Sequence, residues 1–209
     1  MGILAAAGAA KSLPDTDGQT PLHVAMRHDQ AAAAAALVAA GAERSKANRW
    51  GATPLHVAAT WGAAGAAAAV VGPAGFVDLN QLDAKTRTAL FVAAVKGHAD
   101  VARVLVAAGA GLNLFEHSDD LTPLHAAAVR AYTDVAKVLV GAGCNPDLPD
   151  KSNGYTPLHA AATRGHVATV KVTQPRPHLS HAAPALSSSC TPVYSRLRCS
   201  LVPLHRLHR

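Results

Sequence analysis

The chain has 209 residues, of which 50% are hydrophobic but only 4% aromatic, and its formal net charge is +6. This length suffices for one domain or for one repeat array with a tail, and the alanine-dominated apolar fraction favours closely packed helices over a wide core. The distribution of this charge argues against nucleic-acid binding by the main part of the chain. Residues 1–171 are nearly neutral, and five arginines in residues 172–209 carry the surplus.

Three cysteines form no Cys-x-x-Cys pair, which indicates a reducing, intracellular compartment, cytoplasmic with the nucleus left open. The apolar N-terminal run lacks the basic residues that precede the core of a signal peptide. The longest apolar stretches are short or are broken by glycine and proline. We therefore expect no membrane span.

Taken in chain order, the first element is a partial one. Residues 3–9 read Ile-Leu-Ala-Ala-Ala-Gly-Ala, and the same Ala-Gly-Ala ending returns at residues 40–42 and 108–110. We interpret residues 1–14 as the remnant of a preceding repeat. On this reading the chain is a fragment.

A block that reads Thr-Pro-Leu-His in four of its five copies marks the repeats that follow. Threonine can cap a helix N-terminus, proline suits the first helical turn, and the leucine and alanines of the block face a core. A glycine nine residues after the threonine predicts a left-handed residue that ends this first helix. The copies begin at Thr20, Thr53, Thr88, Thr122 and Thr156, at spacings of 33, 35, 34 and 34 residues.

A second helix is expected after each glycine, with apolar residues at helical spacing such as Val101, Val104 and Leu105. A further glycine ends it, and roughly 8–12 polar residues then predict a turn or hairpin. Such a helix pair cannot bury its apolar face alone, so neighbouring pairs must stack. The pattern predicts five repeats that fill residues 15–172 and start near residues 15, 48, 83, 117 and 151.

These residues and this period resemble the ankyrin repeat family. The resemblance covers roughly residues 3–171 and includes the Gly-His pairs at residues 97–98 and 165–166. It implies an all-α fold, an ankyrin-repeat solenoid of stacked helix-turn-helix units with projecting β-turn or hairpin loops. In that family the histidine of the block is structural and ties loops together through hydrogen bonds.

Two departures from the pattern lead to specific expectations. Repeat 2 is longer, and Gly-Pro-Ala-Gly follows its second helix at residues 72–75, so we expect an irregular connection near residues 72–82. Repeat 3 carries Ala89 and Phe91 where the other copies have proline and histidine. We expect Phe91 to pack where the histidine would lie.

Residues 173–209 are rich in proline, serine, arginine and histidine and show no amphipathic period, which predicts a disordered basic tail. We interpret the tail as the product of an unspliced or frame-shifted gene prediction. The alternative is a basic tail that contacts nucleic acid or anionic lipid.

We expect no catalytic residue, no metal site and no cofactor. The twelve histidines include one in each of the four Thr-Pro-Leu-His blocks, about a repeat apart rather than around one ion. No phosphate-binding loop, nucleophile elbow or zinc-protease motif occurs. Cys144 lacks a partner base and is interpreted as a bystander thiol.

The resemblance implies that hairpin tips and the exposed ends of the first helices line a concave groove for a partner. Tryptophan, tyrosine and arginine are favoured anchors at interfaces, and the cations in the middle of the groove predict a partner with an acidic segment. Arg27 is assigned to the groove on the first helix of repeat 1. The residues predicted to bind the partner in the groove are Arg49, Trp50, Trp61, Lys85, Arg87, Lys96, Asp119, Arg130, Tyr155 and Arg164.

The leading hypothesis is a non-catalytic scaffold that binds another protein through this groove, without a small-molecule substrate. A second hypothesis makes the chain the recognition arm of a larger enzyme or channel. A third, nucleic-acid binding through the tail, predicts binding that depends on salt and vanishes without residues 173–209.

Overall fold

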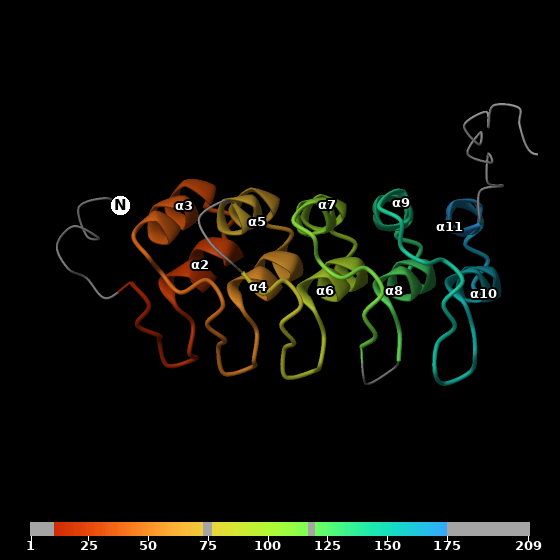
Figure 1. Cartoon of the computed structure of the whole chain (residues 1–209), viewed down its shortest axis with the longest axis horizontal. Coiled ribbons are helices and arrows are strands. Elements are labelled where there is room, and N and C mark those ends of the chain that lie inside the picture. Colours follow the sequence, from red (N-terminus) through yellow and green to blue (C-terminus); the bar gives the residue numbers. More distant parts are fainter. Residues whose placement is uncertain (1–10, 73–76, 117–119, 175–209) are drawn as a thin grey trace, which may run out of the picture. The chain divides into compact units, whose positions relative to one another are not determined.

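The computed structural model describes residues 11–72, 77–116 and 120–174. These residues lie in one compact unit, Met1–Pro175, and form five helix pairs stacked in a row (Figure 1). The tail and the N-terminal remnant expected from the sequence lie outside the described residues, except for residues 11–14 and 173–174. The pairs are α2 (Pro21–Arg27) with α3 (Ala31–Ala39), α4 (Pro54–Trp61) with α5 (Ala64–Val71), α6 (Ala89–Lys96) with α7 (Ala99–Ala107), α8 (Pro123–Val129) with α9 (Thr133–Gly141), and α10 (Pro157–Thr163) with α11 (Val167–Thr173).

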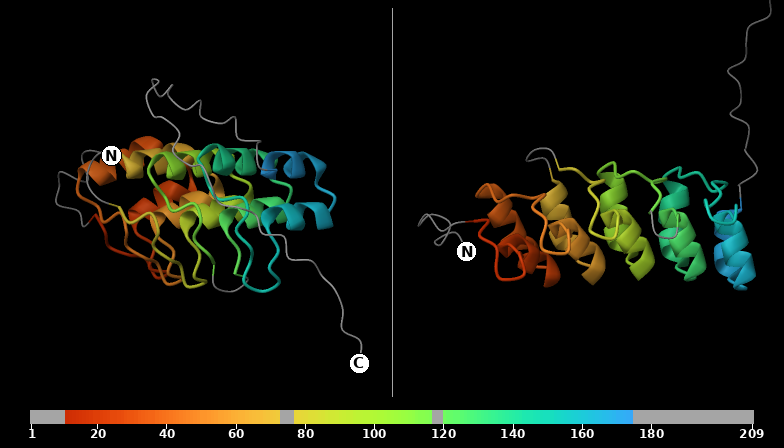
Figure 2. Two further views of the ribbon diagram at one scale, coloured as in Figure 1. Left: turned by 45° about the vertical axis from the view of Figure 1, so that its right-hand side comes forward. Right: turned by 90° about the horizontal axis from the view of Figure 1, so that it is seen from below.

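The helices form two layers. Each first helix packs against the first helix of the next repeat, and each second helix packs against the next second helix, as Figures 1 and 2 show. The loops before the first helices project from the first-helix side of the stack. Among the described residues there is no strand, so the predicted all-α solenoid is confirmed.

The core is narrow and rich in alanine. One leucine per first helix is almost fully buried in repeats 1 to 4, and the second helices add pairs such as Val101 with Leu105 and Val135 with Leu139. Between them lie alanines with no exposed surface, among them Ala58, Ala93 and Ala127. Small side chains let neighbouring helices approach closely, which offsets the small area that each alanine buries.

The first helices begin as the sequence predicts. The threonine before each of them has an extended backbone, for example φ −79° at Thr53 and φ −80° at Thr88, and proline occupies the first turn wherever the block contains it. Proline is tolerated there because its missing N–H would have no helical partner.

The histidines of the block connect successive repeats, as expected. Nδ1 of His23 accepts the backbone N–H of Thr20 at 3.1 Å, so the proton sits on Nε2, which donates to the carbonyl of Ala52 at 3.0 Å. His56 reaches the carbonyl of Arg87 at 2.8 Å, and His125 reaches that of Tyr155 at 2.9 Å. We call these three inter-repeat hydrogen bonds the histidine tethers.

Phe91 interrupts the tethers between repeats 3 and 4. It lies in α6 at the histidine position and is only 6% exposed, which confirms the expected packing. Its backbone N–H donates to the hydroxyl of Thr88 at 3.1 Å, so the helix start is kept. A phenyl ring cannot donate to the next loop, however, and the carbonyl of Leu121, which corresponds to those of Ala52 and Arg87, gains no histidine partner.

The left-handed residues that end the first helices are confirmed at Gly62, Gly97 and Gly165, with φ between 70° and 80°. The corresponding residues of repeats 1 and 4 are Asp29 and Ala131, which adopt φ of 48° and 59° without being glycine. Asp29 gains a compensating contact, because its carboxylate accepts the N–H of Ala66 at 2.8 Å near the start of α5. Ala131 has no side chain that could do the same.

The connection after repeat 2 differs from the others. The second helices of repeats 1, 3 and 4 are followed by Gly41, Gly109 and Gly143, all with φ between 84° and 93°. Gly72 instead caps α5 with φ −57° and ψ 177°, an extended conformation that any residue can adopt. The predicted irregularity is therefore present at its first residue, while residues 73–76 lie outside the described part.

Candidate partner-binding groove

The candidate groove is built from the projecting loops and the adjoining first helices. Each loop is closed by a backbone hydrogen bond from its first residue to its last, at 2.9 Å between Asp15 and Gln19 and at 3.0 Å between Asn48 and Ala52. Successive loops also bond to each other, because Arg49 N–H donates to Asp17 and Ala84 N–H donates to Trp50. The loops of repeats 1 to 3 thus form a connected row.

The loops of repeats 4 and 5 contain one residue more than the sequence pattern suggested. Their first residues are Glu116 and Asp150, six residues before the threonine rather than five, and their N–H groups donate to Leu121 and Tyr155. The Asp150 carboxylate accepts the N–H groups of Asn153 and Tyr155 at 2.7 and 3.2 Å. The repeat starts predicted near residues 117 and 151 therefore lie one residue after the observed loop starts.

The aromatic groove residues lie open on the surface. Trp50 is 46% exposed, Trp61 60% and Tyr155 47%. Trp50 lies in the loop of repeat 2 and Trp61 at the end of α4. Tyr155 closes the loop of repeat 5, where its ring stacks on His159 with 5.5 Å between centroids.

Two of the expected groove cations are engaged within the chain. Arg49 forms an ion pair with Asp17 at 2.7 Å, and its guanidinium lies 4.4 Å from the ring of Trp50. Arg87 donates through two nitrogens to Oδ2 of Asp83, at 2.6 and 3.0 Å. Burial opposes ionisation of Asp83, but the hydrogen bonds from Arg87 outweigh it, so the pKa of this carboxyl lies below its ordinary value.

The other cations are exposed and form no ion pair with any residue that the structure describes. Within residues 11–72, 77–116 and 120–174, no ion pair is formed by Lys85, Lys96, Arg130 or Arg164, all of which are exposed. Arg27 lies one position earlier in its repeat than Trp61 and Lys96 do in theirs, and it donates to Gln19 at 2.6 Å. His28 holds the position in repeat 1 that corresponds to Trp61 and Lys96.

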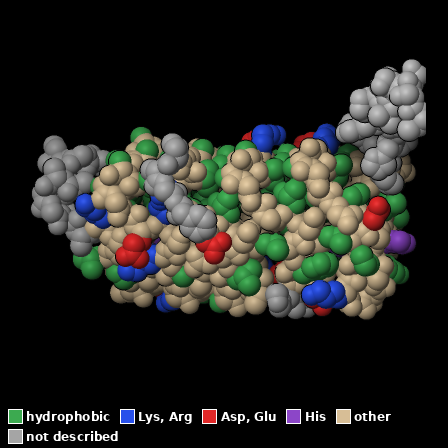
Figure 3. Space-filling view, viewed as in Figure 1, with side chains coloured by type: hydrophobic (Ala, Val, Ile, Leu, Met, Phe, Trp, Pro, Cys, Tyr) green, Lys and Arg blue, Asp and Glu red, His purple; other side chains and the backbone are tan. Residues whose placement is uncertain are grey.

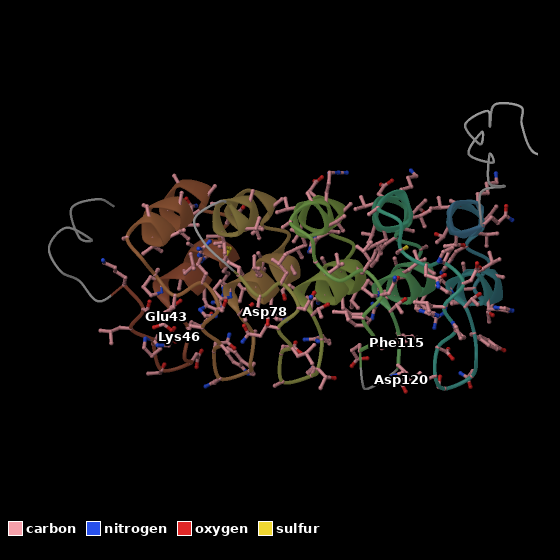
Figure 4. The ribbon with its side chains drawn as sticks, in the orientation of Figure 1. Glu43, Lys46, Asp78, Phe115 and Asp120 are labelled. Atoms are coloured by element: carbon pink, nitrogen blue, oxygen red, sulfur yellow. The ribbon has the colours of Figure 1, made fainter. Side chains whose placement is uncertain are left out.

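Asp119 lies outside the described residues. Its neighbour Asp120 pairs with Lys151 at 3.1 Å, and the Lys151 ammonium lies 4.8 Å from the ring of Phe115. Phe115 and Asp120 both belong to the loop region of repeat 4, as labelled in Figure 4. Sequence reasoning missed Lys151 and Phe115, because their pairing joins two loops that are far apart in the chain.

The structure brings one subset of the groove residues together. Lys85, Arg87 and Arg130 line a pocket of about 270 Å³ between repeats 3 and 4, together with Phe91 and Val95. On the face shown in Figure 3, charged side chains form small separate groups over a largely uncharged surface. The pocket is a defined recess within the candidate groove.

Comparison with protein-family models gives a match that spans most of the chain. The model for ankyrin repeats (3 copies) matches residues 2–75, 72–150 and 112–172. The chain belongs to the ankyrin repeat family. Ankyrin repeats are in general protein–protein interaction modules and are typically non-catalytic. Comparison with curated proteins gives no match.

The ankyrin stack offers little to other chemistries. In the described part of the chain, no three histidine, cysteine, aspartate or glutamate side chains gather closely enough to hold a metal ion. No helix of that part is long and apolar enough to cross a membrane. Cys144 is 6% exposed, and burial raises the pKa of its thiol to about 11, which leaves it a poor nucleophile.

Proposed function

We propose that this ankyrin stack is a non-catalytic scaffold that binds a partner protein through the groove formed by the projecting loops and the first helices. The segment of the partner that enters the groove is acidic. The groove residues are those expected from the sequence, with Arg49 and Arg87 acting partly as supports for the loops.

The observation that carries this proposal is an imbalance of pairing. Three of the described loop carboxylates form ion pairs within the chain: Asp17 with Arg49, Asp83 with Arg87, and Asp120 with Lys151. The carboxylates of Asp15 and Asp150 accept backbone N–H groups of their own loops. The four exposed cations Lys85, Lys96, Arg130 and Arg164 have no such partner in the described residues. A surface with satisfied acids and unsatisfied bases favours an acidic ligand, and it does so by steering as well as by contact.

The aromatic residues support the same face. Tryptophan and tyrosine are enriched among the residues that contribute most of the binding energy at interfaces. Both tryptophans of the chain and Tyr155 lie on the loops or first-helix ends, each about half exposed or more. They supply apolar contact area beside the cations.

A charge-reversal experiment on the full chain tests the proposal. The groove variant is Lys96→Glu with Arg164→Glu. The control variant is Arg103→Glu with Lys137→Glu, which makes the same charge change on the second helices α7 and α9, where these residues are also exposed. Proteins captured from a cell extract by each variant would be quantified by mass spectrometry against wild type.

We expect the groove variant to lose most of the partners that wild type retains, and the control variant to keep them. Captured proteins should bind less at higher salt, since the attraction is screened. Equal capture by both variants, or loss in the control alone, would show that the groove face is wrongly assigned.

A further inference from the structure

The pocket between repeats 3 and 4 combines departures from the repeat pattern that occur together nowhere else in the described stack. The first is Phe91, which replaces a hydrogen-bonding histidine by an apolar ring. The second is Ala126, which stands where repeats 1 to 3 carry Val24, Val57 and Val92 and therefore leaves the space of two methyl groups. Both residues line the pocket.

The third departure is a pair of valines in the pocket lining. Val95 and Val129 lie seven residues after the threonine in repeats 3 and 4, where the other repeats have Arg27, Thr60 and Thr163. Both valines line the pocket and are half-buried. Phe91, Ala126, Val95 and Val129, which give the pocket much of its apolar lining, are thus particular to this junction rather than to the ankyrin pattern.

The size of the pocket limits its occupant. Its volume of about 270 Å³ lies just below the range of roughly 300–1,000 Å³ that is usual for small-molecule sites. Three predicted groove residues, Lys85, Arg87 and Arg130, belong to its lining. This volume suits one large side chain from a bound segment, the kind of contact that anchors many interfaces.

The charged residues in the pocket lining determine which partner residue is favoured beside the bound side chain. Lys85 and Arg130 stand in its lining without an ion pair in the described residues, whereas Arg87 is held by Asp83. Glu116 is the one carboxyl among the lining residues and is 3% exposed, so it offers no open acidic surface. The accessible charge of the pocket is therefore positive.

We infer that the pocket between repeats 3 and 4 binds one large apolar side chain of the partner segment, with an aspartate or glutamate of that segment beside it paired to Lys85 and Arg130. This inference rests on the proposed groove function. It adds which residues of a partner segment the groove selects. An acidic segment without an apolar anchor, or an apolar segment without an acid, would bind more weakly.

Peptide display on the full chain tests the inference directly. A random peptide library is panned on immobilised wild-type protein, and selected peptides are measured by fluorescence polarisation. The key variant is Ala126→Val, which restores the side chain of repeats 1 to 3 and fills the pocket. The matched control is Ala160→Val, the same change at the same position of repeat 5, outside the pocket lining.

We expect the selected peptides to share a large apolar residue next to an acid. Ala126→Val should weaken their binding about tenfold or more, and Ala160→Val by less than about twofold. Changing the apolar residue of the peptide to alanine should have an effect on wild type similar to that of filling the pocket.

A second variant guards against misfolding of Ala126→Val, which changes a buried position. Lys85→Glu alters only an exposed side chain and should weaken the same peptides while leaving the melting temperature unchanged. Peptides that Lys96→Glu with Arg164→Glu weakens, but that neither Ala126→Val nor Lys85→Glu affects, would overturn the pocket and leave the groove standing. Peptides insensitive to all of these changes would contradict the groove itself.

Discussion

The imidazole of His56 and the backbone carbonyl of Arg87 join repeat 2 to repeat 3 through a hydrogen bond of 2.8 Å. The same ring accepts the N–H of Thr53 through Nδ1, so one side chain starts its own helix and holds the next loop. Replacing His56 by phenylalanine, the residue of repeat 3, should lower the free energy of unfolding by about 1–2 kcal/mol. Urea denaturation followed by circular dichroism would measure it, and no loss would mean that the tether is energetically neutral.

The three tethers predict a pH dependence of stability. Burial lowers the pKa of His23, His56 and His125 below 6.5, and the hydrogen bonds to the next loops only partly oppose this. The unfolded chain then binds more protons just below pH 6.5, so the stabilisation is complete above that pH and is lost as pH falls through the lowered values.

Melting temperatures measured from about pH 7.5 to about pH 5 should fall most steeply below pH 6.5. His56→Phe should flatten this fall, since one of the three rings with a lowered pKa is removed. The buried carboxyl of Asp83 contributes only at lower pH, because its pKa lies below the ordinary value of 3.8. A flat profile between pH 6.5 and 5 would contradict the assignment of neutral imidazoles.

Ala131 predicts a stabilising substitution. It adopts φ 59°, where other repeats place Gly62, Gly97 and Gly165, and a left-handed alanine costs roughly 1–2 kcal/mol. Ala131→Gly should raise the free energy of unfolding by up to about 1 kcal/mol after the greater freedom of the unfolded glycine is counted. Ala136→Gly inside α9 is the opposite control and should lower it by about 1 kcal/mol.

At the corresponding position of repeat 1, replacing Asp29 should lower the stability of the protein rather than raise it. Its carboxylate accepts the N–H of Ala66 at 2.8 Å, near the positive end of α5, whose own N-cap residue is Ala63. Asp29→Ala keeps the left-handed backbone and removes the cap. Thermal denaturation should show a loss of about 1–2 kcal/mol, and Asp29→Asn should recover part of it.

The close approach of the loops can be tested with two glycines. A Cβ on Gly51 would lie 2.6 Å from the backbone nitrogen of Ala84, whereas a Cβ on Gly154 would meet nothing within 4 Å. Both have φ near +70°, so the backbone strain of an alanine is shared. Gly154→Ala should cost roughly 1–2 kcal/mol and Gly51→Ala clearly more. Equal losses would mean that the loop row can open without penalty.

The sequence predicted the features that depend on local pattern. The threonine before each first helix, the proline in four of the five, the left-handed Gly62 and Gly97, and the buried Phe91 all follow from period and residue type. The tethers were expected from the family resemblance. These features could be predicted because each depends on neighbouring residues at a fixed position in the repeat.

Contacts between repeats at irregular positions could not be predicted in the same way. The cap that Asp29 provides joins residues 37 apart, and the Asp120–Lys151 pair depends on loops that are one residue longer than the pattern. The cations on the surface looked equivalent in the sequence. Only the geometry distinguishes Arg87, bonded to Asp83, from Lys85, which remains open.

The missing tether at Phe91 has a mechanical consequence. Histidine tethers stiffen the junctions between repeats 1 and 2, 2 and 3, and 4 and 5. At the junction between repeats 3 and 4, Phe91 can offer only apolar packing at this place, although Asn145 N–H donates to Asn113 elsewhere in the junction at 3.0 Å. Apolar packing is not directional, so this junction resists shear less than the others do. Under tension applied to its two ends, the array should bend and first separate between repeats 3 and 4.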